Sequence, residues 1–285
     1  MKKSLLYIPL LSMLLLASCN EEVEPVDEEQ DEQSTLAEEH AEESGTSENE
    51  QKIDVDAESQ EEAETVEQAP LYELNPKTYS IQPIGEANPK VVLLTIDDAP
   101  DKRALDMAKT LKSLDAPAIF FVNGHFIATD EKKAILKEIY DMGFMIGNHT
   151  MTHPNLKTLS EEEQREEISA LNDIVEEVTG ERPVFFRAPF GANTDFSRAL
   201  AIEEGMQLMN WSYGYDFDRE YMTKEKIADV MVNTELLRNG SNLLMHDRDW
   251  TADALEDIVN GLRDKGYEFV EPKFIKGLVD QKEGE

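Results

Sequence analysis

Two histidines lie four residues apart in the stretch GNHTMTHPNL, at His149 and His153, in a chain with only five histidines. Imidazole nitrogens are common ligands of zinc and related divalent ions. If the chain turns helically after His149, this spacing places both rings on one face, near enough to share an ion. Two histidines alone make a weak site, and chance placement explains the spacing equally well. A carboxylate nearby would strengthen the metal interpretation, since two histidines and one Asp leave positions open for water.

Asp97 and Asp98 are adjacent carboxylates that directly follow the apolar run VVLLTI. At a buried strand end such a pair repels and is costly to desolvate, unless cations stabilise both charges. We expect a metal ion at Asp98 and the guanidinium of Arg187 near Asp97. The alternative is a solvated acidic turn ahead of Ala99 and Pro100.

The elements that must position these residues alternate between short apolar runs and amphipathic stretches, which predicts a parallel sheet covered by helices. The expected strands are 91–96, 118–122, 144–147, 184–187, 207–211, 242–246 and 267–270. The expected helices are 102–114, 131–142, 161–178, 196–204, 224–238 and 252–265. Such a sheet is either open and doubly wound or closed into a barrel.

Unusual polar residues collect where these strands end. They are Asp97 and Asp98, His149, Arg187, Trp211 and His246. In parallel α/β folds the carboxyl ends of the strands line one mouth, so these residues are expected to converge there. No GxGxxG or GxxxxGK[ST] pattern follows any strand, and a nucleotide-binding role therefore has no support.

Five motifs in order resemble those of the NodB-type polysaccharide deacetylases, carbohydrate esterase family four. They are TIDDAP (95–100), HTMTH (149–153), RAPFG (187–191), the 211–217 region and LMH (244–246), with AIFFVNG (118–124) similar to the second strand of that family. The likeness covers about residues 85–272. It implies a distorted (β/α)-barrel of about seven parallel strands with a metal ion at its mouth.

The resemblance also implies a role for each residue. Asp98, His149 and His153 would bind a divalent metal, most often zinc, with cobalt, nickel or manganese as alternatives. Asp97 would be the general base, Arg187 would hold it in place, and His246 would be the general acid. The backbone N–H of Phe190 would bind the oxyanion, and Trp211 and Leu244 would shape the acetyl pocket.

The chain departs from the family pattern at several positions. Ala99 stands where Gly is usual and Ile96 where Phe is usual. In WSYGYDFD, Asp216 is the choice to orient His246, although the spacing also allows Asp218. His125 lies outside the motifs and is interpreted as a structural or rim residue. Three aromatic residues could stack on sugar rings or simply pack in the fold, namely Tyr213, Tyr215 and Trp250.

The implied activity is metal-dependent removal of N-acetyl groups from a cell-surface or extracellular polysaccharide, such as peptidoglycan or another N-acetylglucosamine polymer. O-acetyl groups remain an alternative substrate. The alternative of another class is a catalytically inactive surface lipoprotein that binds glycans. Residues 71–285 contain 24 basic and 40 acidic residues, and this excess of negative charge argues against nucleic acid as a partner.

The N-terminus predicts secretion and lipid attachment. Lys2 and Lys3 precede an apolar run from Leu5 to Leu16, and Leu16-Ala17-Ser18-Cys19 resembles a bacterial lipobox. We therefore expect a signal peptide at 1–18, a lipidated Cys19 at the start of an acidic disordered linker (19–75), and a catalytic domain at 76–285. The expected product is an extracytoplasmic, membrane-anchored lipoprotein that is a monomer.

Overall fold

The computed structural model of the chain describes residues 69–277. By contacts the chain divides into two units, Met1–Glu62 and Ala63–Glu285, and only the second contains described residues. The predicted signal peptide, Cys19 and all but the last part of the predicted linker lie outside the described residues. Among residues 69–277, no helix has the length and apolar character needed to span a membrane.

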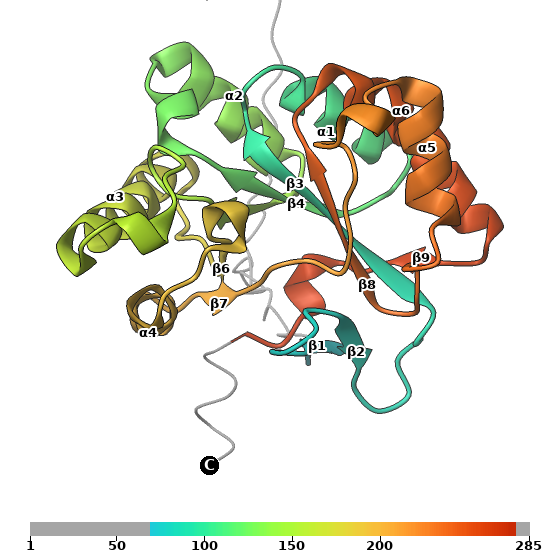
Figure 1. Ribbon diagram of the computed structural model, residues 1–285, viewed down its shortest axis with the longest axis horizontal. Coiled ribbons are helices and arrows are strands. Elements are labelled where there is room, and N and C mark those ends of the chain that lie inside the picture. Colours follow the sequence, from blue (N-terminus) through green and yellow to red (C-terminus); the bar gives the residue numbers. More distant parts are fainter. Residues whose placement is uncertain (1–68, 278–285) are drawn as a thin grey trace, which may run out of the picture. The chain divides into compact units, whose positions relative to one another are not determined.

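A seven-stranded parallel sheet forms the centre of the fold, with the path β7-β6-β5-β4-β3-β8 and β9 beside β3 (Figure 1). The strands are β3 (Val91–Ala99), β4 (Ala118–Val122), β5 (Met145–Asn148), β6 (Phe185–Phe186), β7 (Gln207–Leu208), β8 (Ser241–His246) and β9 (Glu268–Phe269). One isolated parallel bridge between Tyr213 and Leu243 joins the chain after β7 to β8. The sheet is thus a half-barrel, and the predicted distorted barrel of parallel strands is confirmed.

Six α-helices connect the strands, as predicted. They are α1 (Ala104–Ser113), α2 (Asp130–Asp141), α3 (Glu161–Thr179), α4 (Asp195–Glu203), α5 (Lys224–Asn233) and α6 (Asp249–Asp264). Short 3-10 helices are η1 (Gly124–Ile127), η2 (Leu156–Thr158), η3 (Pro189–Gly191), η4 (Arg219–Tyr221) and η5 (Pro272–Phe274). Helix α3 begins with a capping box of Ser160 and Glu163 and ends at Gly180 with φ 89°. Helix α5 ends five residues earlier than expected, where the Thr234 hydroxyl accepts a hydrogen bond from the Leu236 N–H.

A β-hairpin of β1 (Tyr72–Leu74) and β2 (Ile81–Pro83) precedes the sheet and is not predicted from the sequence. It lies on both sides of the predicted domain boundary at residue 76. The Ile81 N–H donates to the carbonyl of Gly240, directly before β8, at 2.7 Å. A Cβ atom at Gly240 would lie 1.9 Å from the Ile81 carbonyl oxygen, so glycine is required there. Tyr72 also forms a parallel bridge with Ile275.

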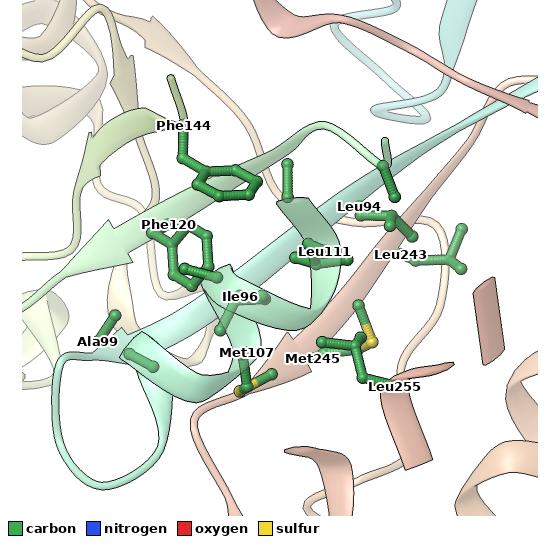
Figure 2. Packing of buried hydrophobic residues seen from close by; sticks show 14 of the residues in the cluster. Leu94, Ile96, Ala99, Met107, Leu111, Phe120, Phe144, Leu243, Met245 and Leu255 are labelled. Atoms are coloured by element: carbon green, nitrogen blue, oxygen red, sulfur yellow. The ribbon is translucent and has the colours of Figure 1, made fainter. Parts of the chain in front are cut away.

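The outer face of the sheet packs against helices α1, α5 and α6 (Figure 1). In β3 the alternate residues Val92, Leu94 and Ile96 point to this face, where all three are buried. Figure 2 shows Leu94 and Ile96 beside Leu243 and Met245 of β8, with Met107 and Leu111 of α1 close by.

The inner face of the half-barrel has a different composition along the same strands. Near the start of β3, Val91 and Leu93 pack with Phe121 of β4 and with the hairpin. Toward the end of β3, the alternation places Thr95 and Asp97 on this inner face, and both are buried. Apolar side chains therefore fill the interior of the half-barrel near the amino ends of the strands, and polar side chains line it at the carboxyl ends.

Candidate active site

Asp98, His149 and His153 come together at the carboxyl ends of β3 and β5. One ligand atom of each residue lies within 4.8 Å of the others. The Nε2 atoms of His149 and His153 lie 3.8 and 3.5 Å from Oδ1 of Asp98. The structure thus assembles the predicted trio, with one carboxylate oxygen facing both imidazoles.

The backbone between the two histidines is not the helical turn that the spacing of four suggested, and this interpretation is wrong. Thr150 and His153 have φ values of 71° and 60°, in the left-handed region. The Thr150 N–H donates to Oδ1 of Asn148 at 2.9 Å, and Glu167 of α3 accepts from both the N–H and the hydroxyl of Thr152. A loop held by side chains, and no helix, brings the two rings together.

His149 has the tautomer that a metal ligand needs. Its Nδ1 lies 2.7 Å from the carbonyl oxygen of Arg187, so Nδ1 carries the hydrogen and Nε2 keeps a free lone pair toward Asp98. Burial lowers the pKa of His149 in spite of the nearby Asp97 and Asp98 charges, and it lowers the pKa of His153 in the same way. Both imidazoles are therefore neutral near pH 7. Two neutral histidines and one carboxylate fit a divalent ion such as zinc.

Asp97, the predicted general base, is held by Arg187. Nη1 of Arg187 lies 2.6 Å from Oδ1 of Asp97 and 2.8 Å from the hydroxyl of Thr95. The guanidinium is fully buried, and the carbonyls of Met209 and Asn210 accept its other N–H groups. Burial lowers the pKa of Arg187, while the charge of Asp97 opposes that effect. The other oxygen of Asp97 lies 3.6 Å from Nε2 of His149, next to the predicted metal site.

A second arginine, Arg248, contacts the other carboxylate and was missed from the sequence. Its Nη2 lies 2.6 Å from Oδ2 of Asp98, the oxygen that does not face the imidazoles. Burial raises the pKa of Asp98, but Arg248 and the protonated forms of His149, His246 and His153 outweigh it and leave the pKa below its usual value. The only signal in the sequence was an arginine two residues after the His246 motif.

His246, the predicted general acid, ends β8 beside Asp216. Its Nδ1 lies 2.7 Å from Oδ1 of Asp216, and the Oδ2 atom accepts hydrogen bonds from the His246 N–H and the Thr251 hydroxyl. Burial lowers the pKa of His246, but the hydrogen bond and charge of Asp216, with Asp97 and Asp98, leave it above the usual histidine value. Asp218, the alternative partner, instead accepts a hydrogen bond from the Glu220 N–H at the start of η4.

The three predicted substrate-binding residues border this cluster. Phe190 is 67% exposed, and its ring lies edge-on to His153, with 4.8 Å between ring centroids. Trp211 lies over the Arg187 guanidinium at 5.9 Å. Leu244 is buried on β8, on the same face as His246.

Backbone strain concentrates at this mouth. Six described residues other than glycine have positive φ, and four of them belong to the site, namely Asp98, Thr150, His153 and Phe190. Each such residue costs on the order of 1 to 3 kcal/mol and persists only where surrounding contacts hold it. The loops at the mouth therefore hold these site residues in place at a cost in local stability.

The remaining candidates have structural contacts. His125 is exposed, and both its backbone N–H and its Nδ1 contact the carbonyl of Met151. The hydroxyl of the buried Tyr213 donates to the carbonyl of Met231, and that of Tyr215 contacts Thr234. Trp250 donates its indole N–H to the carbonyl of Asp216. These contacts favour packing over sugar stacking for the three aromatic residues.

Comparisons of the sequence identify the family. Residues 84–209 match the polysaccharide deacetylase family. The peptidoglycan-N-acetylmuramic acid deacetylase PdaC of Bacillus subtilis is 32% identical over 223 residues, which are 76% of this chain and 45% of PdaC. A peptidoglycan-N-acetylglucosamine deacetylase of Bacillus cereus is 32% identical over 198 residues, 65% of this chain and 68% of that protein. The chain belongs to the polysaccharide deacetylase family, and the predicted class of enzyme is confirmed at this level.

Solved structures agree with this assignment. A solved structure of PdaC superposes with a TM-score of 0.58 at 30% identity, covering 69% of this chain and 95% of that structure. A pseudoenzyme of carbohydrate esterase family four from Bacillus anthracis gives the same TM-score at 30% identity, covering 63% of each chain. The family therefore includes at least one member described as inactive. Whether a member is active therefore depends on the residues at its mouth.

Proposed function

We propose that this protein is a metal-dependent deacetylase that hydrolyses N-acetyl groups of peptidoglycan. The observation that carries the proposal is the convergence at one mouth of the His149–His153–Asp98 trio, an Arg187-bound Asp97 and an Asp216-bound His246. A divalent ion in the trio would lower the pKa of a water molecule and polarise the acetyl carbonyl.

Asp97 would be the general base of this reaction. This carboxylate would accept a proton from the attacking water molecule while the water oxygen bonds to the acetyl carbon. Arg187 fixes one oxygen of Asp97 at 2.6 Å, which leaves the other oxygen for the proton. The Phe190 N–H would donate to the carbonyl oxygen as negative charge develops on it. Trp211 and Leu244 would surround the acetyl methyl group.

His246 would be the general acid of this reaction. The C–N bond breaks only if the departing nitrogen takes a proton, because an amide anion is a very poor leaving group. Asp216 holds Nδ1 of His246 and raises its pKa, which leaves Nε2 as the proton donor. The products are acetate and a free amino sugar, and proton transfer from Asp97 back to His246 through solvent completes the cycle.

The choice of peptidoglycan rests on the relatives. PdaC is named for N-acetylmuramic acid and the Bacillus cereus protein for N-acetylglucosamine, so the polymer is shared but the sugar differs. We therefore propose peptidoglycan as the polymer, with either of its two N-acetylated sugars as the site of deacetylation. N-acetylglucosamine oligomers and O-acetylated xylan are the alternative substrates.

Acetate release tests the proposal. The purified protein, stripped with a chelator and reloaded with zinc, is incubated with peptidoglycan, N-acetylglucosamine oligomers and acetylated xylan, with the Bacillus cereus relative as positive control. We expect zinc-dependent acetate from peptidoglycan, in large excess over an Asp97→Asn control. No acetate from any substrate, together with retained binding to peptidoglycan, would support the alternative of an inactive glycan-binding protein.

We also propose that the protein is exported and held at the membrane by a lipid on Cys19. Its support is the lipobox pattern at residues 16–19, with Cys19 as the only cysteine of the chain. A covalent lipid would keep a polymer-directed enzyme next to the cell wall. Metabolic labelling with a radioactive fatty acid tests this anchor, and an unlabelled protein would refute it.

A further inference from the structure

The two aspartates of the mouth each contact a separate arginine, and the two contacts are alike in geometry. Nη1 of Arg187 lies 2.6 Å from Oδ1 of Asp97, and Nη2 of Arg248 lies 2.6 Å from Oδ2 of Asp98. Both are short, charge-assisted hydrogen bonds. Arg187 belongs to the family motif RAPFG, whereas Arg248 lies beyond LMH and has no role in the function proposed above.

The oxygen that Arg248 contacts matters for the site. Oδ1 of Asp98 faces both imidazoles, with Nε2 of His153 at 3.5 Å, while Oδ2 is turned to Arg248. A carboxylate with one oxygen engaged by a guanidinium offers the other oxygen alone to an ion. Without that contact, both oxygens of Asp98 would be free to bind an ion as a chelating pair.

The arginine is itself held in place. Its Nη1 donates to the carbonyl of Asp247 at 3.0 Å and lies 3.6 Å from a carboxylate oxygen of Asp101. Arg248 is the N-cap residue of α6, but its side chain makes no capping hydrogen bond. The backbone of Arg248 therefore begins helix α6, while its side chain makes its contacts at the site. The side chain of Arg248 is 28% exposed, and that of Asp98 is 11% exposed.

We propose that Arg248 is a positioning residue, which binds Oδ2 of Asp98 and thereby makes this aspartate a one-oxygen ligand with its rotamer set before any ion arrives. The inference rests on the proposed function, because it requires Asp98 to be a metal ligand. Asp98 has φ 63°, in the left-handed region, and such a backbone persists only where surrounding contacts hold the residue in place. Contacts of this kind, one shell beyond the ligands, change metal affinity by about 10-fold to 100-fold.

Metal binding gives a readout separate from activity. Zinc affinity of the whole chain is measured by competition with a chromophoric chelator for the wild type, Arg248→Gln and Arg248→Lys. We expect about 10-fold weaker binding for Arg248→Gln and partial recovery for Arg248→Lys, which keeps the charge but has no planar fork. In the cobalt-loaded protein, Arg248→Gln should also weaken the visible absorption, since a chelating Asp98 raises the coordination number.

Arg103→Gln is the matched control. Arg103 is also an N-cap residue, of α1, and its side chain is 34% exposed, but it pairs with Asp106, Asp249 and Asp253, away from Asp98. This variant should bind zinc as the wild type does, and thermal unfolding of the metal-free proteins checks that all variants fold.

The outcomes are distinct. If Arg248→Gln binds zinc at least as tightly as the wild type, with an unchanged cobalt spectrum, the inference is overturned and the proposed function stands. The same holds if Arg103→Gln weakens binding equally. If the wild type binds no ion, the proposed metal site fails and the inference fails with it.

Discussion

His149 and His246 lie at one mouth, and the partners of their Nδ1 atoms differ in charge. In each, Nδ1 is held at 2.7 Å, by the carbonyl oxygen of Arg187 in one case and by the carboxylate of Asp216 in the other. The uncharged carbonyl does not offset burial, and the pKa of His149 falls. The carboxylate outweighs burial, and the pKa of His246 rises. Near neutral pH the same side chain is thus suited to binding a cation at one position and to giving up a proton at the other.

The largest expected effects distinguish a metal ligand from the catalytic acid and base. His153→Ala should lose both zinc and activity, because it removes a ligand. His246→Ala and Asp97→Asn should lose activity by about 100-fold to 10,000-fold, the usual worth of acid or base catalysis, while they keep the ion. Measuring both the zinc content and the acetate release of each variant distinguishes the loss of a metal ligand from the loss of an acid or base. Equal loss of zinc in His153→Ala and Asp97→Asn would contradict the assignment of the two aspartates.

A smaller effect is expected when the partner of His246 loses its charge. Asp216→Asn should lower the rate by about 10-fold to 100-fold, less than removal of the acid itself. A general acid works only while protonated, so activity declines as pH rises through the raised pKa of His246. Without the Asp216 charge that pKa falls, and the alkaline side of the pH profile should move to lower pH. An alkaline limb that stays in place would show that His246 is not the titrating acid.

The smallest effect concerns the loop that carries His153. Glu167→Ala removes both hydrogen bonds to Thr152 and should weaken zinc binding by about fivefold, which corresponds to one hydrogen bond worth ~1 kcal/mol. The neighbouring Glu166 is exposed, and Glu166→Ala serves as the control. Isothermal titration of the metal-free proteins with zinc measures both. An unchanged affinity in Glu167→Ala would mean that the loop keeps its shape without the Glu167 side chain.

Much of the fold could be predicted because its signals are local. The capping box at Ser160 and Glu163 and the stop at Gly180 fix α3 from a few neighbouring residues, and buried parallel strands appear as uninterrupted apolar runs. The β1–β2 hairpin could not be predicted in this way. Its two strands have three residues each, and its stability comes from contacts with Gly240 and Ile275, which lie far along the chain.

The site was predictable in its residues and much less so in its geometry. The placement of Asp97, His149 and His246 at strand ends follows from the topology of a parallel sheet. The left-handed backbone at Thr150 and His153 does not follow from residue type, since neither is glycine. The choice of Asp216 over Asp218 and the contact of Arg248 with Asp98 depend on how the loops after β7 and β8 approach each other. Spacing in the sequence carries no information about that approach.

The hairpin also shows at which end of the sheet the chain enters and leaves the described domain. Residues 71–72 and 274–276 are hydrogen-bonded to each other, so both ends of the described domain leave from the same place. That place adjoins Gly240 at the amino end of β8, whereas His246 ends the same strand. Six residues of strand separate the two by roughly 20 Å. The chain that precedes residue 71 therefore joins the domain at the amino end of the sheet, opposite the mouth formed by the carboxyl ends of its strands.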